Sequence, residues 1–379
     1  MEKIDSNKRR IYFDWAASAP YSQISSAAPF GNPSSLHSEG RLAKQCLEDA
    51  RKRCAAFFNV PAQLLFFTSG GTESNSIALF STLTRPGKGR IISSLAEHAS
   101  IRDGMKTLEK MGKPCGYIAV DSAGRVTPDT FSKALTQYPD TRFAAIMSVN
   151  NETGAVSDIA SITSCADGNK APVHFHCDLV QAVGKIPIDI QSWNIDSASI
   201  SAHKIGGPRG IGLLYLRKPI EVFYSGGGQE NGIRGGTENV QGAVSLADCL
   251  EALNDIEEQN KKAKTRWNRL ITALCKIDRC TIIPKERVAD DDRFSPYILQ
   301  AAFNNIPGEV MARALDDLGI AVSTGSACSS SSQERPVLAA MGIGEKLRVE
   351  GIRISQGWYT TDEEIELLID GITEVLKTL

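Results

Sequence analysis

The 379-residue sequence lacks several features that would place it in a specialised class. It has no apolar stretch near the ~18 residues needed to span a bilayer, no internal repeat and no low-complexity segment. The start, MEKIDSNKRR, is polar, so we expect no signal peptide and a cytoplasmic protein. Lys and Arg total 42 against 44 Asp and Glu. This balance excludes a strongly basic nucleic-acid binder as the default and an acidic disordered chain.

The sequence also lacks closely spaced pairs of cysteines. The nine cysteines are scattered, odd in number and without a C-x-x-C pair, which favours a reducing compartment over a disulfide framework. Most of them are expected to be inert buried side chains. One or two at most can then take part in chemistry.

What the sequence does contain is an alternation of short apolar runs with helix-like stretches. The spacing of Leu42, Cys46, Ala50 and Cys54 predicts one of these helices. Strands separated by helices indicate crossover connections, and therefore an α/β fold with a mainly parallel sheet. The runs typical of strands are LLFF (64–67), RIISS, YIAV, FAAIMSV, VHFHC, DSASIS and GIGLLYL.

The pattern changes in the last third of the chain. Residues 238–274 are predicted to form one long helix, followed by strands in LQAAFNNI, AVSTG and GIRISQGWYT and a helix in GEVMARALDDLG. The string Thr361–Glu364 has the spacing of a capping box, which predicts the start of the last helix. We expect a large domain over 16–255 and a smaller α+β domain over 256–379, with 1–15 packed on the smaller one.

The sharpest local signal is SAHKIGGPRGIG, which begins at Ser201. Lys204 follows a predicted strand and precedes a Gly- and Pro-rich turn, where a lysine with a lowered pKa can form a Schiff base. A surface lysine in a loop is the alternative. Ser201 and Lys204 also have the S-x-x-K spacing of β-lactamase-like acyl transferases, but neither K-T-G nor S-D-N follows in the sequence.

A second string, TSGGTESN, lies between a predicted strand and a predicted helix. Gly71 and Thr72 would expose backbone N–H groups at the positive end of the helix, which favours a phosphate. An ordinary helix cap is equally consistent with this string. The pattern G-x-x-x-x-G-K-[ST] does not occur here, which argues against a nucleoside triphosphate.

A third string, HFHCD, places His174, His176 and Asp178 on one face of a strand. The three could ligate a metal. Alternatively, Asp178 could point as a lone carboxylate into the crevice at the carboxyl end of the strand, where open α/β sheets bind ligands. We favour the carboxylate and no metal, with both histidines packed or hydrogen-bonded in the core.

Three further residues are candidates for chemistry. Cys328 stands in STGSACSSSS without apolar neighbours, so we expect an exposed, mobile loop and a nucleophilic thiol. A tolerated surface thiol is the alternative. Arg353 in GIRIS and Asn32 in GNPSSLH could bind a carboxylate, although each residue type is more often structural.

An anion cradle, a lone aspartate, a Schiff-base lysine and an exposed thiol together suggest pyridoxal phosphate chemistry directed at sulfur. The sequence resembles the cysteine desulfurases of the NifS/IscS type, in class V of the aminotransferase superfamily with fold type I. Its loop around Cys328 is similar to that of the long-loop NifS/IscS group. The matching strings occur in the family's order over nearly the whole chain: GNPSSLH, FTSGGTESN, EH, VNNETG, DLVQAVGK, SAHKIGGPRGIG, RGGTEN, STGSACSS and IRIS.

The resemblance implies roles around the ring of pyridoxal 5′-phosphate (PLP). Lys204 would hold the cofactor covalently and act as the acid and base at the substrate Cα. Asp178 would pair with the pyridine nitrogen, so that the ring works as an electron sink. Gln181 and Asn151 would hydrogen-bond near the ring hydroxyl, and His98 would stack on the ring.

The remaining implied roles concern the phosphate, the substrate and the sulfur. Arg353, helped by Asn32, would bind the carboxylate of L-cysteine. Cys328 would attack the substrate sulfur, become a persulfide and pass the sulfur to an acceptor such as an iron–sulfur scaffold, while alanine leaves. We expect no nucleic acid and no membrane as partners. The phosphate would be held by Gly71, Thr72, Ser201, His203 and, in the neighbouring subunit of a homodimer, Thr237.

The sequence departs from the family pattern at three places. Trp15 follows Asp14 where relatives usually have Asn, Ser157 replaces a usual Gln, and DLVQ replaces D-A-x-Q. The change at Trp15 leaves open a shifted substrate or a dedicated partner. The alternative activities are a selenocysteine lyase or another class V PLP enzyme. A degenerate member that serves as a sulfur-carrier scaffold is a further alternative, against which the intact Lys204, Asp178 and Cys328 argue.

Overall fold

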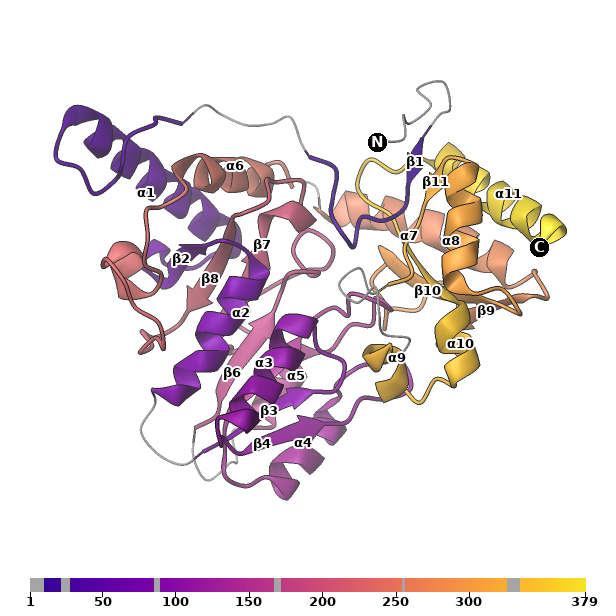
Figure 1. Cartoon of the computed structure of the whole chain (residues 1–379), viewed down its shortest axis with the longest axis horizontal. Helices are drawn as coiled ribbons and strands as arrows, with labels where there is room; N and C mark the ends of the chain where they lie inside the picture. The colour runs from indigo at the N-terminus through magenta and orange to yellow at the C-terminus, as the bar shows by residue number, and fades with distance from the viewer. Residues whose placement is uncertain (1–9, 22–27, 85–88, 167–171, 254–255, 326–334) are drawn as a thin grey trace.

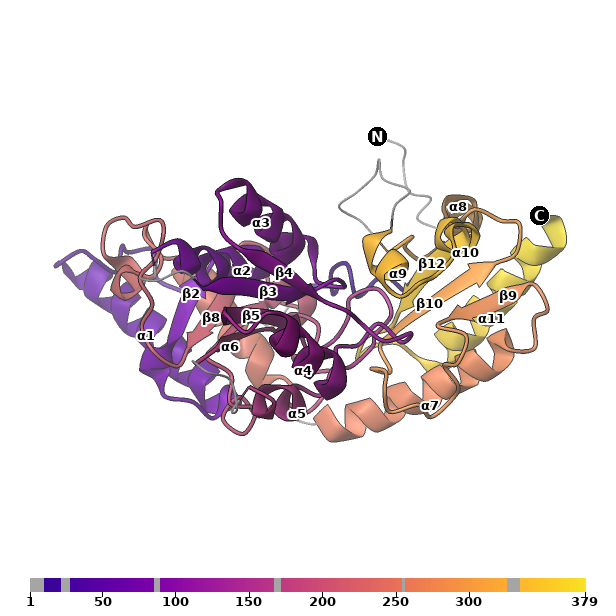
Figure 2. The ribbon, with the colours of Figure 1, turned by 90° about the horizontal axis from the view of Figure 1, so that it is seen from below.

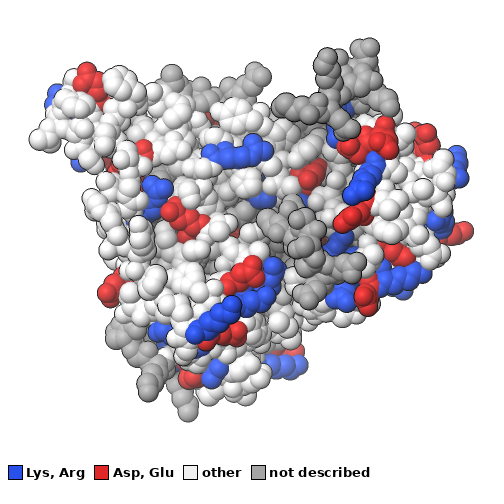
Figure 3. Space-filling model, viewed as in Figure 1, with Lys and Arg blue, Asp and Glu red and all other residues white. Residues whose placement is uncertain are grey.

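The computed structural model describes residues 10–21, 28–84, 89–166, 172–253, 256–325 and 335–379. Two units lie side by side, one around a seven-stranded sheet and one around a three-stranded sheet (Figure 1). Within the described ranges, no helix is both long and apolar enough to cross a membrane. On the face shown in Figure 3, positive and negative side chains are interspersed rather than gathered by sign.

The large sheet has the strand order β2-β8-β7-β6-β5-β3-β4. β8 runs antiparallel to both of its neighbours, and the remaining pairs are parallel. This confirms the α/β fold with a mainly parallel sheet, and each apolar run expected in this part overlaps a strand. The bounds are β2 Leu65–Thr68, β3 Arg90–Ser94, β4 Cys115–Ile118, β5 Thr141–Met147, β6 His174–Asp178, β7 Ser197–Ser201 and β8 Gly212–Leu216.

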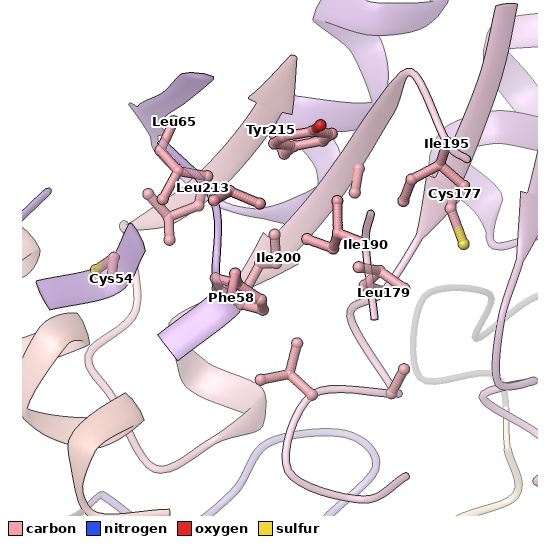
Figure 4. Close-up of a cluster of buried hydrophobic side chains, with 14 of the residues drawn as sticks. Cys54, Phe58, Leu65, Cys177, Leu179, Ile190, Ile195, Ile200, Leu213 and Tyr215 are labelled. Atoms are coloured by element: carbon pink, nitrogen blue, oxygen red, sulfur yellow. The ribbon is translucent and has the colours of Figure 1, made fainter. Parts of the chain in front are cut away.

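Helices cover both faces of this sheet (Figure 2). One face packs on α2 and α3, and the other on α1, α4, α5 and α6. In Figure 4, side chains of α1 point toward those of β2, β7 and β8, on the sheet face that packs on α1, α4, α5 and α6. The bounds are α1 Ser38–Phe58, α2 Gly71–Phe80, α3 Ala99–Lys110, α4 Pro128–Gln137, α5 Ile159–Ser164 and α6 Val240–Glu251.

The helix predicted from the spacing of Leu42, Cys46, Ala50 and Cys54 is α1. The helix forms, but Leu42 is 51% exposed, whereas Leu47, Ala50 and Cys54 are buried. A strict four-residue repeat drifts around the helix by about 40° per step. The buried face therefore follows mixed steps of three and four residues, and Leu42 lies off it.

The second unit is an antiparallel sheet in the order β12-β10-β9, covered by helices. The N-terminal strand β1 pairs in parallel with β11, and Ile11 and Phe13 lie in the hydrophobic cluster of this unit. The domain limits themselves stay a prediction. The bounds are β1 Ile11–Tyr12, β9 Cys280–Ile283, β10 Ile298–Phe303, β11 Ile320–Ala321, β12 Gly351–Ser355, α7 Ile256–Leu274, α8 Gly308–Asp317, α9 Pro336–Ala340, α10 Glu345–Glu350 and α11 Asp362–Thr378.

Two predictions for this region were wrong in part. The single helix over 238–274 is divided into α6 and α7, because α6 is buried along almost its whole length in the large unit while α7 packs one stripe against the other unit. The strand in AVSTG ends at Ala321, because Ser323 instead exchanges backbone hydrogen bonds with Arg353 of β12. The capping box at Thr361–Glu364 is confirmed at the start of α11.

Candidate functional site

A cavity of about 410 Å³ lies where β2, β6 and β7 end and α2 begins. These three strands point the same way, so their carboxyl ends meet at one edge of the sheet. Ten of the thirteen residues singled out from the sequence line this cavity: Gly71, Thr72, His98, Asn151, Asp178, Gln181, Ser201, His203, Lys204 and Arg353.

The start of α2 forms a narrow cradle at one side of the cavity. Gly70 has a φ of 151°, which side chains rarely adopt, and a Cβ at Gly71 would lie 2.6 Å from Cγ2 of Val180. Glycine at these two positions therefore lets the helix start pack closely against Val180 and Ser201. The first N–H groups of a helix have no intrahelical partner, and Ser201 borders the same cradle. This donor set fits a phosphate.

His203 borders the cavity beside the cradle. Burial, followed by the positive charges of Lys204 and Arg209, lowers the pKa of His203 to about 4. The ring is therefore neutral at physiological pH. It can offer a hydrogen bond to a phosphate but adds no positive charge.

Asp178 is buried and held by two donors. The backbone N–H of Val180 donates to Oδ1 (2.9 Å), and Nδ2 of Asn75 donates to Oδ2 (2.8 Å). Asn75 Oδ1 in turn meets Nε2 of His176 at 2.9 Å. Burial lowers the pKa of His176 to about 3, so this ring is neutral and orients the Asn75 amide.

The metal alternative finds no support in the histidine geometry. His174 Nε2 and His176 Nδ1 each lie 2.8 Å from the hydroxyl oxygen of Ser197. The ring of His174 also stacks on Phe143. Among the residues that the structure describes, no group of three potential metal ligands occurs. Both histidines are hydrogen-bonded, as we expected; His176 is buried in the core, whereas His174 is half-buried.

Lys204 ends a short 3₁₀ turn, Ala202–Lys204, directly after β7. Its Nζ donates to the carbonyl oxygens of Ala16 (2.5 Å) and Ala17 (2.8 Å) in the N-terminal segment. The Nε2 of Gln181 donates to the same Ala16 oxygen at 2.9 Å. The amine is thus fixed at the wall of the cavity by two backbone carbonyls.

His98 and Asn151 face the cavity from two other loops. His98 is the N-cap of α3, where Nδ1 accepts from the N–H of Ser100 at 3.2 Å. Burial lowers the pKa of His98 against the opposing effect of Asp178, so the ring stays neutral at physiological pH. Oδ1 of Asn151 is buried without a hydrogen-bond partner among the described residues. Such an orphaned acceptor fits a hydrogen-bonding ligand in this cavity.

Arg353 reaches the cavity from β12 of the smaller sheet. Its guanidinium donates to Oδ1 of Asp14 (2.8 Å) and to the backbone oxygens of Asn151 (2.9 Å) and Gly325 (3.2 Å). A substrate carboxylate at Arg353 would therefore compete with Asp14.

The other three predicted residues are not placed in the cavity. The exposed Asn32 accepts from the N–H of Ser34 at 2.9 Å in the turn before α1. Thr237 is also exposed, away from this cavity. Cys328 lies outside the described residues.

Four residues were missed by the sequence reasoning: Asn75, Glu97 and Glu152, which line the cavity, and Lys185, which hydrogen-bonds to the cavity residue Gln181. Each stands inside one of the quoted strings, and that was the only signal for them. Their roles depend on burial and on partners. Burial raises the pKa of Glu97 to about 8, for example, and its Oε1 accepts from Ser94 and from the N–H of Met147.

The model of the aminotransferase class-V family matches residues 11–368. The chain belongs to this family. It is 35% identical to the cysteine desulfurase IscS of Methanosarcina thermophila, over 100% of this chain and 95% of that protein. It is 36% identical to the IscS of Dictyoglomus turgidum, over 98% and 96%.

Solved structures agree with the family assignment. A NifS-like protein superimposes with a TM-score of 0.89 at 33% identity, over 98% of this chain and 100% of that one. A NifS-like protein from Rickettsia africae gives 0.83 at 29% identity, over 97% and 100%. These findings confirm the resemblance and the fold type. Class V enzymes use PLP, and the phosphate cradle, the fixed carboxylate of Asp178 and the amine of Lys204 fit that cofactor.

Proposed function

We propose that this protein is a PLP-dependent cysteine desulfurase, which removes sulfur from L-cysteine and releases L-alanine. The observation that carries this proposal is the placement of Lys204, Asp178 and the Gly71 cradle around one cavity in a chain similar to IscS over its full length. Bound PLP supplies an aldehyde that takes up amines and a ring that withdraws electrons from the substrate Cα.

The residues of this chain have separate tasks in the reaction. Lys204 binds the cofactor through Nζ and then moves the proton at the substrate Cα. Asp178, whose two oxygens are fixed by Asn75 and Val180, holds the proton at the pyridine nitrogen. Arg353 binds the substrate carboxylate and releases Asp14 as it does so.

Cys328 is the proposed sulfur acceptor, and its tether supports this role. Gly325 lines the cavity, and three residues of extended chain reach at most about 10 Å. The thiolate of Cys328 can thus come to a substrate sulfur at this site. A sulfur–sulfur bond forms, the carbon–sulfur bond breaks, and the persulfide is then passed to an acceptor protein.

We also propose a homodimer and a reducing, cytoplasmic location. Large apolar side chains are exposed beside the two segments that the family resemblance assigns to ligand binding: Phe30 and Leu36 around Asn32, and Tyr224 before Thr237. A second copy would cover them. The eight described cysteines are all free, which a reducing compartment maintains.

The domain limits are the remaining proposal. We propose a division near residue 255, supported by the separate hydrophobic clusters of the two sheets. The ligand cavity would then lie between the domains, because Arg353 comes from the smaller sheet and Lys204 from the end of a strand in the larger one.

Borohydride reduction of the PLP-loaded protein, followed by peptide mass analysis, tests the cofactor link. We expect the label on Lys204, and a label elsewhere would contradict the proposal. Cys328→Ser should keep the cofactor spectrum but lose alanine formation from cysteine, whereas Cys275→Ser, at an exposed cysteine, should keep both. If Cys328→Ser still turns over cysteine at the full rate, the thiol has no role in the reaction, and the alternative of a selenocysteine lyase or another class V PLP enzyme is favoured.

A further inference from the structure

Lys185 is a buried lysine that has no acidic partner in the described part of the chain. It is 3% exposed, and its Nζ donates to Oε1 of Gln181 at 2.6 Å. Within the described residues, no carboxylate lies within ion-pair distance of this amine. Burying a lysine in this way is unfavourable, so its presence beside a cavity residue calls for an explanation.

The hydrogen bond decides how Gln181 is oriented. A lysine amine donates hydrogen bonds, so the atom it meets in the Gln181 carboxamide is the oxygen. The amide nitrogen must then face the other way, and it does, donating to the carbonyl oxygen of Ala16 at 2.9 Å. Gln181 therefore presents a donor, and not an acceptor, to the cavity wall.

The hydrogen bond to Gln181 is available at either charge on Lys185. Burial, with the nearby positive charges of Lys204 and Arg353, lowers its pKa to about 7. Both the ammonium and the neutral amine have N–H groups to donate. Lys185 can thus donate to Oε1 of Gln181 in either protonation state, and the ammonium, which cannot accept, excludes the reversed amide.

We propose that Lys185 is a positioning residue for cofactor binding: its bond to Gln181 holds the amide nitrogen toward the cavity, where it donates to the ring oxygen of PLP. The proposal rests on the proposed function for the identity of the cofactor. It also accounts for the place of Ala16, whose carbonyl oxygen is shared by Gln181 and Lys204. When the amine of Lys204 is taken up by the cofactor, Gln181 remains as a hydrogen-bond donor to the carbonyl oxygen of Ala16.

The test compares Lys185→Met with the purified wild-type protein by direct titration with PLP. Without Lys185 the Gln181 carboxamide can flip, which exchanges its oxygen and nitrogen. We therefore expect the dissociation constant for PLP to rise about tenfold, the effect of one hydrogen bond. The loss of a donor to the ring oxygen should also raise the pH midpoint of the visible absorption band by about 0.5–1 unit. Lys113→Met is the matched control, because Nζ of Lys113 donates to the backbone oxygen of Thr82 away from the cavity.

Two further variants keep the result decisive. Lys185→Gln retains an N–H donor and should recover the wild-type midpoint. In a Gln181→Ala background, Lys185→Met should change neither quantity further. An unchanged affinity and midpoint in Lys185→Met, or equal shifts with and without Gln181, would overturn the inference. Failure of the wild-type protein to bind PLP at all would instead overturn the proposed function.

Discussion

Gly71 tests whether the cradle is as narrow as the structure shows. In Gly71→Ala the new methyl group would lie 2.6 Å from Cγ2 of Val180, about 1 Å inside ordinary contact. Overpacking of this kind destabilises a protein by about 1–3 kcal/mol. Alanine regains up to about 1 kcal/mol through its higher helix propensity. We expect a net loss of about 1 kcal/mol in the free energy of unfolding, and weaker PLP binding because the cradle must shift.

The contact can be isolated by a double-mutant cycle with Val180→Ala, which removes the clashing methyl group. The stabilities of the four proteins, measured by urea denaturation without PLP, should give a favourable coupling of about 1–2 kcal/mol between the two substitutions. PLP affinity should recover in the double variant. Gly226→Ala is the control, since its methyl group would meet nothing within 4 Å. A coupling near zero would refute the narrow cradle.

Two buried carboxylates supply further predictions. Because burial raises the pKa of Glu97 to about 8, the folded protein keeps a proton there that the unfolded chain releases, so stability should fall as pH rises from about 5 to 8, by up to ~1.4 kcal/mol per unit. Urea denaturation across this range should show that slope reduced in Glu97→Gln, and equal slopes would contradict the assignment. Glu230 accepts from both terminal nitrogens of Arg51 at 2.7 Å in a buried pair. Glu230→Gln should therefore lose about 3–5 kcal/mol of stability, while Asp129→Asn, at an exposed pair, should lose under about 1 kcal/mol; similar losses in both would count against a special role for burial.

The strands of the large sheet could be predicted from the sequence because each one is marked by its own short run of residues. The strands β5, β6 and β7 are almost entirely buried, so they appear as continuous apolar runs. Lys204 and Asp178 were identifiable because Asp178 ends such a strand and Lys204 follows one closely, each with a side chain whose chemistry is specific. The bonds that orient these side chains were not predictable. Asn75 and Asp178 are 103 residues apart, and Arg353 and Asp14 are 339 apart.

The departure at Trp15 shows how packing decides what a sequence difference means. The Trp15 side chain is buried against Trp358, with ring centroids 5.8 Å apart, and not in the ligand cavity. A Cβ on Gly357 would lie 2.0 Å from this ring, so the glycine makes room for it. The next residue, Ala16, still directs its carbonyl oxygen to Lys204. The larger side chain therefore anchors the N-terminal segment from outside, and the structure gives no reason to expect a shifted substrate from this change.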